Sequence, residues 1–159
     1  MIFNENVRKI LIVVLASVAL SACATSKKQT GKITSDVYTG TDTVEYLANG
    51  VPDRVFFTTN KFSLTTAARD TLRKQSTWLR KNKDITVTIE GHADERGTRE
   101  YNLALGERRA NAAKDYLMTY GVSGKRLSVI SYGKERPVNP ASSPLAWSQN
   151  RRSVTVKAN

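Results

Sequence analysis

The sequence predicts an α+β domain built as a two-layer sandwich, a mixed β-sheet with helices packed on one of its faces. Three observations predict this class. Residues 85–90 alternate apolar and polar side chains, as a strand with one buried face does. Residues 102–120 instead repeat apolar side chains at helical spacing, and residues 153–157 alternate again. The predicted order is β-α-β-α-β-β, in which helical crossovers permit parallel neighbours and the last strand can return antiparallel.

The first strand and the first helix are predicted between residues 52 and 81. Val55-Phe56-Phe57 forms a short apolar run after the turn residues Pro52-Asp53. Ser63 suits a helix N-cap. The helix that follows, to about Lys81, carries apolar side chains that are expected to face the sheet: Leu64, Ala68, Leu72 and Leu79.

The second half of the chain supplies the remaining elements. The helix at 102–120 is expected to end at Gly121-Val122, a left-handed cap with a hydrophobic contact. A third strand is predicted at 126–132. Residues 134–144 contain three prolines and are predicted to form an irregular loop, which a short turn at 145–147 joins to the last strand. The side chains that the second helix is expected to bury are Leu103, Ala110, Ala113 and Leu117.

Residues 1–22 are predicted to be a lipoprotein signal peptide. Two basic residues precede an uncharged apolar run at 10–20, which is shorter than the roughly 20 residues that a transmembrane helix needs. The run ends in Leu-Ser-Ala-Cys, which resembles the cleavage site of bacterial lipoproteins, so Cys23 is the expected lipidation site. An uncleaved anchor helix is the alternative. Ala24 follows, and by resemblance to sorted lipoproteins it favours the outer membrane, with the domain facing the periplasm.

Residues 23–43 are predicted to be the lipidated cysteine and a flexible tether, followed by the folded domain at 44–159. The tether is rich in Thr, Ser, Lys and Gly and shows no periodicity. About twenty residues at ~3.3 Å each reach at most about 65 Å, which would let the domain leave the membrane surface. Because Cys23 is the only cysteine, an intramolecular disulfide is excluded.

The chain is strongly basic, with 25 Lys and Arg against 14 Asp and Glu and a net charge of +11. In an intracellular protein this balance would suggest nucleic acid as the partner. The basic residues are spread along both predicted helices, however, and the sequence contains no RNP-type or zinc-finger motif. Export would remove the genome as a partner, so we expect lipids and cell wall to be the nearby polyanions.

A catalytic function has little support in the sequence. His92 is the only histidine, which disfavours a zinc site, and no G-x-S-x-G nucleophile elbow is present. We expect His92 to be a loop residue that shapes a pocket. No catalytic residue, metal or cofactor is predicted beyond the lipid on Cys23. The alternative function is a cell-wall hydrolase that uses Asp94 and Glu95, although a glycosidase needs two carboxyl groups at a defined separation.

Residues 85–109 join a strand, a polar loop and a basic helical segment. Their string G-H-A-D-E-R-G-T-x-E-Y-N-x-x-L-G-E-R-R-A resembles the OmpA-like peptidoglycan-binding domain, in the version carried by envelope lipoproteins. The resemblance covers most of residues 54–156, including S-Y-G-K-E-R-P-V-N-P at 131–140 and A-W-S-Q-N-R-R-S-V at 146–154. It implies a protein that binds peptidoglycan noncovalently and tethers the outer membrane to the cell wall.

The resemblance also implies a site for diaminopimelate, the stem-peptide residue whose side chain ends in an ammonium and a carboxylate. Asp94, in the G-x-x-D element, would accept from the ammonium, and Arg109, the second Arg of E-R-R-A, would hold the carboxylate. The alternative is that this pair only pins the loop to the helix. Arg151-Arg152 could add a basic rim or be structural. The residues expected to shape the pocket are Ala93, Glu95, Asn102 and Leu105.

One departure from the family pattern concerns the segment after the first strand. Relatives commonly carry aspartates there, whereas this chain has Thr58 and Asn60, so Asn60 would contribute only neutral hydrogen bonds. Resemblance to the lipoprotein members also implies contact with TolB and the Tol machinery.

Overall fold

The computed structural model describes residues 33–34 and 36–158. The elements in chain order are β1 (Ile33–Thr34), β2 (Val37–Tyr38), β3 (Tyr46–Ala48), β4 (Val51–Pro52), β5 (Arg54–Phe56), α2 (Thr66–Lys81), β6 (Val87–His92), α3 (Arg99–Thr119), η1 (Gly124–Arg126), β7 (Leu127–Gly133), α4 (Pro144–Asn150) and β8 (Arg152–Lys157).

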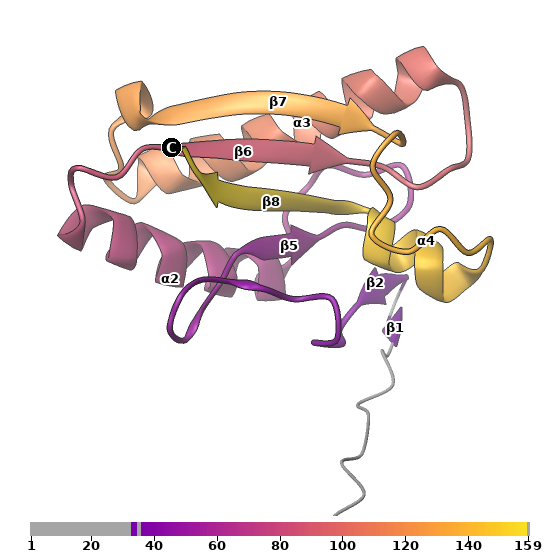
Figure 1. Ribbon diagram of the computed structural model, residues 1–159, viewed down its shortest axis with the longest axis horizontal. Helices are drawn as coiled ribbons and strands as arrows, with labels where there is room; N and C mark the ends of the chain where they lie inside the picture. The colour runs from indigo at the N-terminus through magenta and orange to yellow at the C-terminus, as the bar shows by residue number, and fades with distance from the viewer. Residues whose placement is uncertain (1–32, 35, 159) are drawn as a thin grey trace, which may run out of the picture.

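A four-stranded sheet forms the centre of the domain, in the order β5-β8-β6-β7 (Figure 1). β8 lies antiparallel to both β5 and β6, whereas β6 and β7 are parallel. The parallel pair is possible because α3 provides the crossover between its two strands. The predicted mixed sheet is therefore confirmed.

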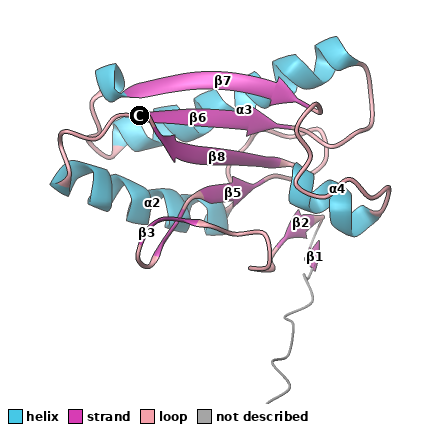
Figure 2. Cartoon of the chain, in the orientation of Figure 1, coloured by secondary structure: helices cyan, strands magenta, loops and turns pink. Residues whose placement is uncertain are grey.

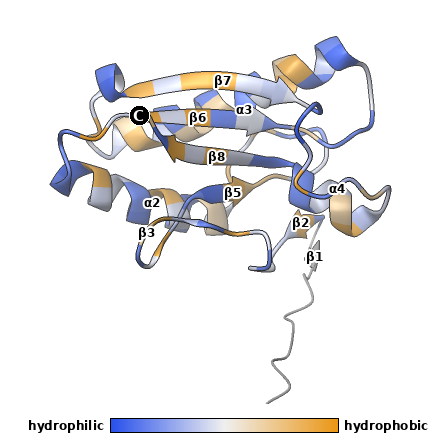
Figure 3. Ribbon diagram, in the orientation of Figure 1, coloured by the Kyte–Doolittle hydropathy of each residue, from blue (hydrophilic) through white to orange (hydrophobic). Residues whose placement is uncertain are grey.

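Helices α2 and α3 cover one face of this sheet, as Figure 2 shows, and the hydrophobic core lies between the two layers. Apolar and polar residues follow one another along α2 at helical spacing (Figure 3). One side of the helix is therefore buried and the other is exposed. The core side chains are Val55, Phe57, Ala68, Leu72, Leu79, Val87, Ile89, Ala110, Ala113, Leu117, Val122 and Leu127.

Both long helices begin at a threonine N-cap rather than at the predicted positions. The hydroxyl of Thr65 accepts from the N–H of Ala68, so α2 starts after Thr65 and not after Ser63. Thr98 accepts from the N–H of Tyr101 in the same way, which starts α3 before Asn102.

The predicted turn at 145–147 lies inside a third helix, α4. The hydroxyl of Ser143 caps this helix by accepting from Ala146, and Pro144 stands in its first turn. Both are ordinary signals of a helix start, because the orphan N–H groups gain an acceptor and proline has no N–H to satisfy. The helix has only 7 residues, too few to show a clear helical period.

The predicted border between tether and domain at residue 44 is wrong for the described part of the segment. Tyr38 is buried and packs edge to face against Phe56, with ring centroids 4.8 Å apart. β1 pairs with β2, so residues 33–34 and 36–43 belong to the folded unit. Strands of two residues leave no periodicity that a sequence could show. Cys23, the predicted signal peptide and residues 24–32 lie outside the described residues.

No helix among residues 33–34 and 36–158 combines the length and the apolarity that crossing a membrane requires.

Candidate ligand-binding site

Two glycines bring β6 and α3 into direct contact beside the site. A Cβ added at Gly91 would lie 1.8 Å from the carbonyl oxygen of Gly106, and one added at Gly106 would lie 2.9 Å from that of Gly91. Neither position has room for a side chain. Because Arg109 follows Gly106 by one helical turn, this close approach places its side chain against the end of β6.

Arg109 is fully buried and holds three backbone segments together. Its Nη1 donates to the carbonyl of His92 (2.8 Å). Its Nε donates to the carbonyl of Lys61 (2.9 Å), and its Nη2 to that of Thr58 (3.1 Å). Burial, and then the charge of Arg151, lowers the pKa of Arg109 to about 10, so the guanidinium stays charged at neutral pH.

Asp94 is buried as well, and two other arginines occupy its carboxylate. Arg96 donates from Nη2 to Oδ2 (2.7 Å) and from Nε to Oδ1 (3.0 Å), and Nη1 of Arg151 lies 3.3 Å from Oδ2. Burial raises the pKa of Asp94, but the hydrogen bonds and charge of Arg96 outweigh it and leave the pKa below its usual value. Within the described part of the chain, no hydrogen bond joins Asp94 to Arg109.

Arg151 connects the site to the N-terminal segment. Its Nη2 donates to the carboxylate of Asp36 (2.9 Å) and to the backbone carbonyl of the same residue (2.5 Å). Its Nε donates to the carbonyl of Phe57 (3.1 Å). The suggested basic rim is therefore wrong for Arg151, because its guanidinium is buried among acceptors that it holds in place.

Asp36 contributes a carboxylate that the sequence did not point to. Its Oδ2 accepts from the backbone N–H of Thr59 (2.7 Å), while half of its side chain stays exposed. Burial raises the pKa of Asp36. The hydrogen bonds from Thr59 and the charge of Arg151 lower it by more than burial raises it, so the net shift is downward. Asp36 thus places an anion beside residues 58–60, where relatives were expected to carry aspartates.

Two predicted residues shape the loop from inside. Ala93 is buried, and its N–H donates to the carbonyl of Gly133 (2.8 Å). Asn102 is buried, and its Nδ2 donates to the carbonyl of Arg96 (2.9 Å), which fixes the backbone of the loop. Leu105 is also buried, and it does not line the pocket described below.

Glu95 instead points outward and ties the loop to α4. Its carboxylate accepts from Nε1 of Trp147 (2.7 Å) and from Oγ of Ser142 (3.1 Å). The guanidinium of Arg96 lies 4.3 Å from the centroid of the Trp147 ring, close enough for a cation–π contact. The loop is therefore supported on both sides before any ligand is present.

A pocket of about 300 Å³ lies beside the loop, and neither Asp94 nor Arg109 lines it. Asn60, the remaining predicted residue, lines it in a left-handed conformation (φ 54°), which asparagine tolerates better than most residues. Asn60 is exposed, as are 42% of the Arg96 side chain and 46% of Tyr101. The complete lining is Thr59, Asn60, Arg96, Gly97 and Tyr101.

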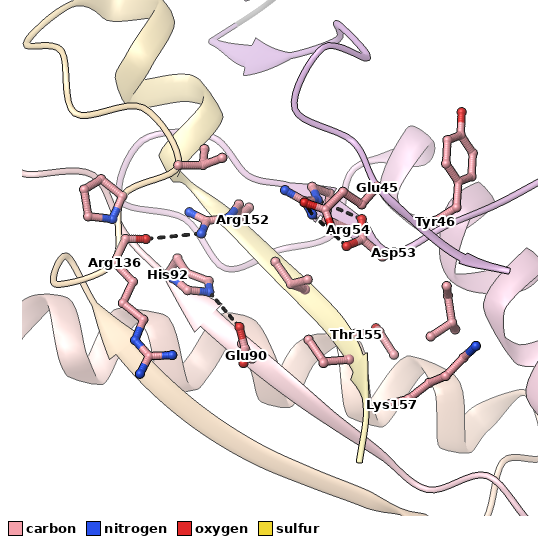
Figure 4. Close-up of a pocket in the computed structure, with 15 residues that line it drawn as sticks. Glu45, Tyr46, Asp53, Arg54, Glu90, His92, Arg136, Arg152, Thr155 and Lys157 are labelled. Carbon is pink, nitrogen blue, oxygen red and sulfur yellow. Dashed lines mark hydrogen bonds and ion pairs between the residues drawn. The ribbon is translucent and has the colours of Figure 1, made fainter. Parts of the chain in front are cut away.

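The expectation that His92 shapes this pocket from a loop is wrong. His92 is the last residue of β6, and its side chain projects to the face of the sheet opposite to α3 (Figure 4). Its Nε2 lies 3.5 Å from the carboxylate of Glu90. Burial, and then the charges of Arg152 and Arg54, lowers the pKa of His92 to about 3. His92 is therefore neutral at pH 7.

No group of three or more His, Cys, Asp or Glu side chains converges on a possible metal position within residues 33–34 and 36–158.

Comparison with known proteins places the chain in a family. Residues 56–151 match the OmpA family. The peptidoglycan-associated lipoprotein of Mesorhizobium japonicum is 44% identical over 152 residues, covering 92% of this chain and 90% of the relative. The protein of the same name from Rhizobium meliloti is 46% identical over 153 residues, covering 92% of this chain and 86% of the relative.

Solved structures agree with the fold. The crystal structure of the peptidoglycan-associated lipoprotein from Burkholderia pseudomallei superposes with a TM-score of 0.65 at 35% identity, over 67% of this chain and 90% of that chain. The C-terminal domain of Helicobacter pylori MotB has a TM-score of 0.63 at 21% identity, over 67% and 84%, and shows the shared fold alone. The chain therefore belongs to the OmpA family, and it resembles the peptidoglycan-associated lipoproteins of that family.

Proposed function

We propose that this chain binds peptidoglycan noncovalently through the diaminopimelate of the stem peptide and so tethers the outer membrane to the cell wall. The observation that carries the proposal is the placement of an ionised carboxylate, Asp94, in the loop after β6, and a charged guanidinium, Arg109, on α3, which donates to the carbonyl of His92 just before that loop. The names of the relatives support peptidoglycan as the ligand.

Arg96 occupies the place on Asp94 that the ligand's ammonium would take. Its guanidinium donates to both carboxylate oxygens, and its partly exposed side chain can swing into the pocket at little cost. A ligand ammonium would then replace one cation by another, so Asp94 never becomes an unpaired buried charge.

Arg109 keeps donors for the ligand's carboxylate. A guanidinium has five N–H groups, and three of those on Arg109 donate to carbonyls. One N–H on each Nη is left, which is the fork that a carboxylate accepts. Charged hydrogen bonds contribute roughly 1.5–3 kcal/mol each, so two or three of them support micromolar binding, about −8 kcal/mol.

Asp36 provides a second acceptor for the ammonium at the mouth of the site. It is half exposed, and its carboxylate lies next to Thr59, which lines the pocket. In this proposal the acid expected after the first strand comes from the N-terminal segment instead.

The anchor in this proposal is the lipid on Cys23. Since the folded unit begins by Ile33, only residues 24–32 separate the lipid from it, and they reach at most about 30 Å at ~3.3 Å per residue. We also infer a role in the Tol-Pal system and in cell division, with TolB as a partner. Resemblance to the peptidoglycan-associated lipoproteins supports that part.

The hydrogen bonds of Asp94 and Glu95 disfavour a function as a cell-wall hydrolase. A glycosidase needs one carboxylic acid whose pKa is raised so that it can protonate the leaving group. Burial raises the pKa of Asp94 but the bonds from Arg96 lower it below normal, and hydrogen bonds from Trp147 and Ser142 lower that of Glu95. Neither acid holds a proton at neutral pH.

Sedimentation with purified cell walls tests the proposal. The full chain in a neutral detergent is mixed with walls that contain diaminopimelate and, separately, with walls that contain lysine at that position. We expect binding to the first kind only, and at least tenfold weaker binding for Asp94→Asn. The matched control is Asp84→Asn, an exposed acid in the turn before β6, at its far end. Equal binding of both variants would overturn the site.

A further inference from the structure

The face of the sheet away from α2 and α3 carries a groove of about 550 Å³ that the proposed wall-binding site does not use. The β3 segment, β8 and residues 136–138 line it (Figure 4). Its volume lies within the roughly 300–1,000 Å³ that is usual for ligand sites. One part of its lining is apolar, through Leu47, Pro137, Val138, Val154 and Val156, and another part gathers Arg54, Glu90, His92 and Arg152.

Arg152 is a buried cation without an ion pair. Only 6% of the residue is exposed, its Nε has no hydrogen-bond partner in the described part of the chain, and no described carboxylate lies within ion-pair distance of it. Its two Nη contacts are long, 3.2 Å to the carbonyl of Arg136 and 3.4 Å to that of Asn150. An uncompensated buried charge is costly, by several kcal/mol per ion in general.

The other buried arginines differ from Arg152 in this respect. Arg151 binds two carboxylates, and the three donor nitrogens of Arg109 each reach a carbonyl within 3.1 Å. Arg54 is also neutralised, since its Nε and Nη2 each donate to a carboxylate oxygen of Asp53 at 2.7 Å. Among these four arginines of the described chain, Arg152 is the one with a buried nitrogen that has no hydrogen-bond partner, and it lines the groove.

His92 adds a second unused polar group to the same part of the groove. Neither ring nitrogen has a hydrogen-bond partner among the described residues, although only 1% of His92 is exposed. A neutral imidazole offers one N–H donor and one acceptor. The Nε–H of Arg152 therefore lacks an acceptor where the groove could supply one, and the nearest carboxylate to His92, that of Glu90, stays 3.5 Å from Nε2.

We propose that this groove binds a ligand with an oxyanion head, a carboxylate or a phosphate, on an apolar stem. Arg152 takes the oxyanion as the charge that compensates its guanidinium, His92 donates a second hydrogen bond, and Val154 and Val156 contact the stem. The groove shares no lining residue with the pocket beside Asp94, so we propose it as a site separate from that of peptidoglycan.

The single histidine makes a direct test possible. The full chain in neutral detergent is titrated with hexanoate, hexyl phosphate and inorganic phosphate, and the ring signals of His92 and the Nε–H signal of Arg152 are followed by NMR. Hexanol, which has the stem without the charge, is the matched ligand control. We expect saturable shifts of both residues with at least one of the two hexyl anions and none with hexanol. Comparison of hexanoate with hexyl phosphate identifies the head group, and comparison with inorganic phosphate shows what the stem adds.

Three variants separate binding from folding. Arg152→Gln should weaken binding of the hexyl anion at least tenfold. Val138→Asp should weaken it severalfold, because it adds a negative charge at the exposed rim without touching the core. Arg69→Gln, at an exposed arginine on α2, should change nothing. The proposal fails if neither hexyl anion shifts His92, if hexanol shifts it as much, or if the Val138→Asp and Arg152→Gln chains bind as the unaltered chain does.

Discussion

Asp36 and Asp94 share one guanidinium, that of Arg151, although they lie in distant parts of the chain. Arg151 donates to the Asp36 carboxylate at 2.9 Å and to that of Asp94 at 3.3 Å. The N-terminal segment and the loop that carries the candidate site are thus held by the same buried cation. A substitution in the N-terminal segment should therefore alter the loop of the candidate site, and the reverse should also hold.

Asp36→Asn tests this connection. The variant loses one ion pair with Arg151 and the charged acceptor of the Thr59 N–H. Because Asp36 is half exposed, solvent screens the pair, and we expect a loss of no more than about 1 kcal/mol in the free energy of unfolding. Affinity for a diaminopimelate peptide should fall severalfold. Urea denaturation and calorimetric titration measure the two effects.

The control for this change is Asp84→Asn, which removes the same charge at the other end of β6. If the two variants unfold at the same urea concentration and bind equally, then the Asp36 contacts contribute neither stability nor affinity.

His92 should make the stability depend on pH well above the range of the carboxylates. Burial lowers the pKa of His92 to about 3, while that of the unfolded chain stays near 6.5. Between these values the unfolded chain binds a proton that the folded chain does not, so stability falls as pH falls, by up to ~1.4 kcal/mol per pH unit. Urea denaturation at pH 7, 6 and 5 measures the slope. His92→Gln should flatten it, and an unchanged slope in that variant would assign it to other groups.

Gly91→Ala should damage both the fold and the site. The added methyl group would lie 1.8 Å from the Gly106 carbonyl oxygen, so β6 and α3 must separate. We expect a loss of about 3 kcal/mol, the upper end for overpacked cores, and weaker wall binding because Arg109 moves with α3. Gly124→Ala is the control, since its methyl group meets the flexible end of Met118 at 3.1 Å. A drop in melting temperature of the same size in both would show that the close approach of the helix is not required.

Arg96→Ala should tighten ligand binding rather than weaken it. The arginine competes with the ligand's ammonium for Asp94, and its partly exposed ion pair is worth about 0.5–1 kcal/mol. Removing it should raise the affinity for a diaminopimelate peptide two- to fivefold. Isothermal titration calorimetry measures this affinity. A lower affinity in Arg96→Ala would contradict the prediction and mean that Arg96 itself contacts the ligand.

The sequence could predict the elements that periodicity and caps define. The long strand β6, the helix α3 and most of the core positions follow from apolar spacing, although Leu103, which was expected to be buried, is only partly buried. The motif also identified Asp94, which the structure places in the loop after β6, and Arg109, which it places on α3, each with other partners than the ones expected. The motif could not show that Arg96 donates to the Asp94 carboxylate or that Arg109 donates to backbone carbonyls, because such contacts depend on side-chain rotamers.

Long-range contacts account for most of the rest. Asp36 and Arg151 meet only because β2 docks beside the end of β5, and no local pattern announces a two-residue strand. His92 was expected to be a loop residue that shapes the pocket because the strand was expected to stop at Gly91. The strand continues for one more residue, and alternation then directs His92 away from the helices.

The most direct test of the account is a calorimetric titration of the full chain with two stem peptides that differ at one residue, diaminopimelate or lysine. The two side chains share the ammonium, and only diaminopimelate has the second carboxylate. We predict micromolar binding of the diaminopimelate peptide, at least tenfold weaker binding of the lysine peptide, and loss of this preference in Arg109→Lys, which keeps the charge but not the fork. Equal affinity for both peptides, or an unchanged preference in Arg109→Lys, would contradict this prediction and leave Asp94 and Arg109 as structural residues.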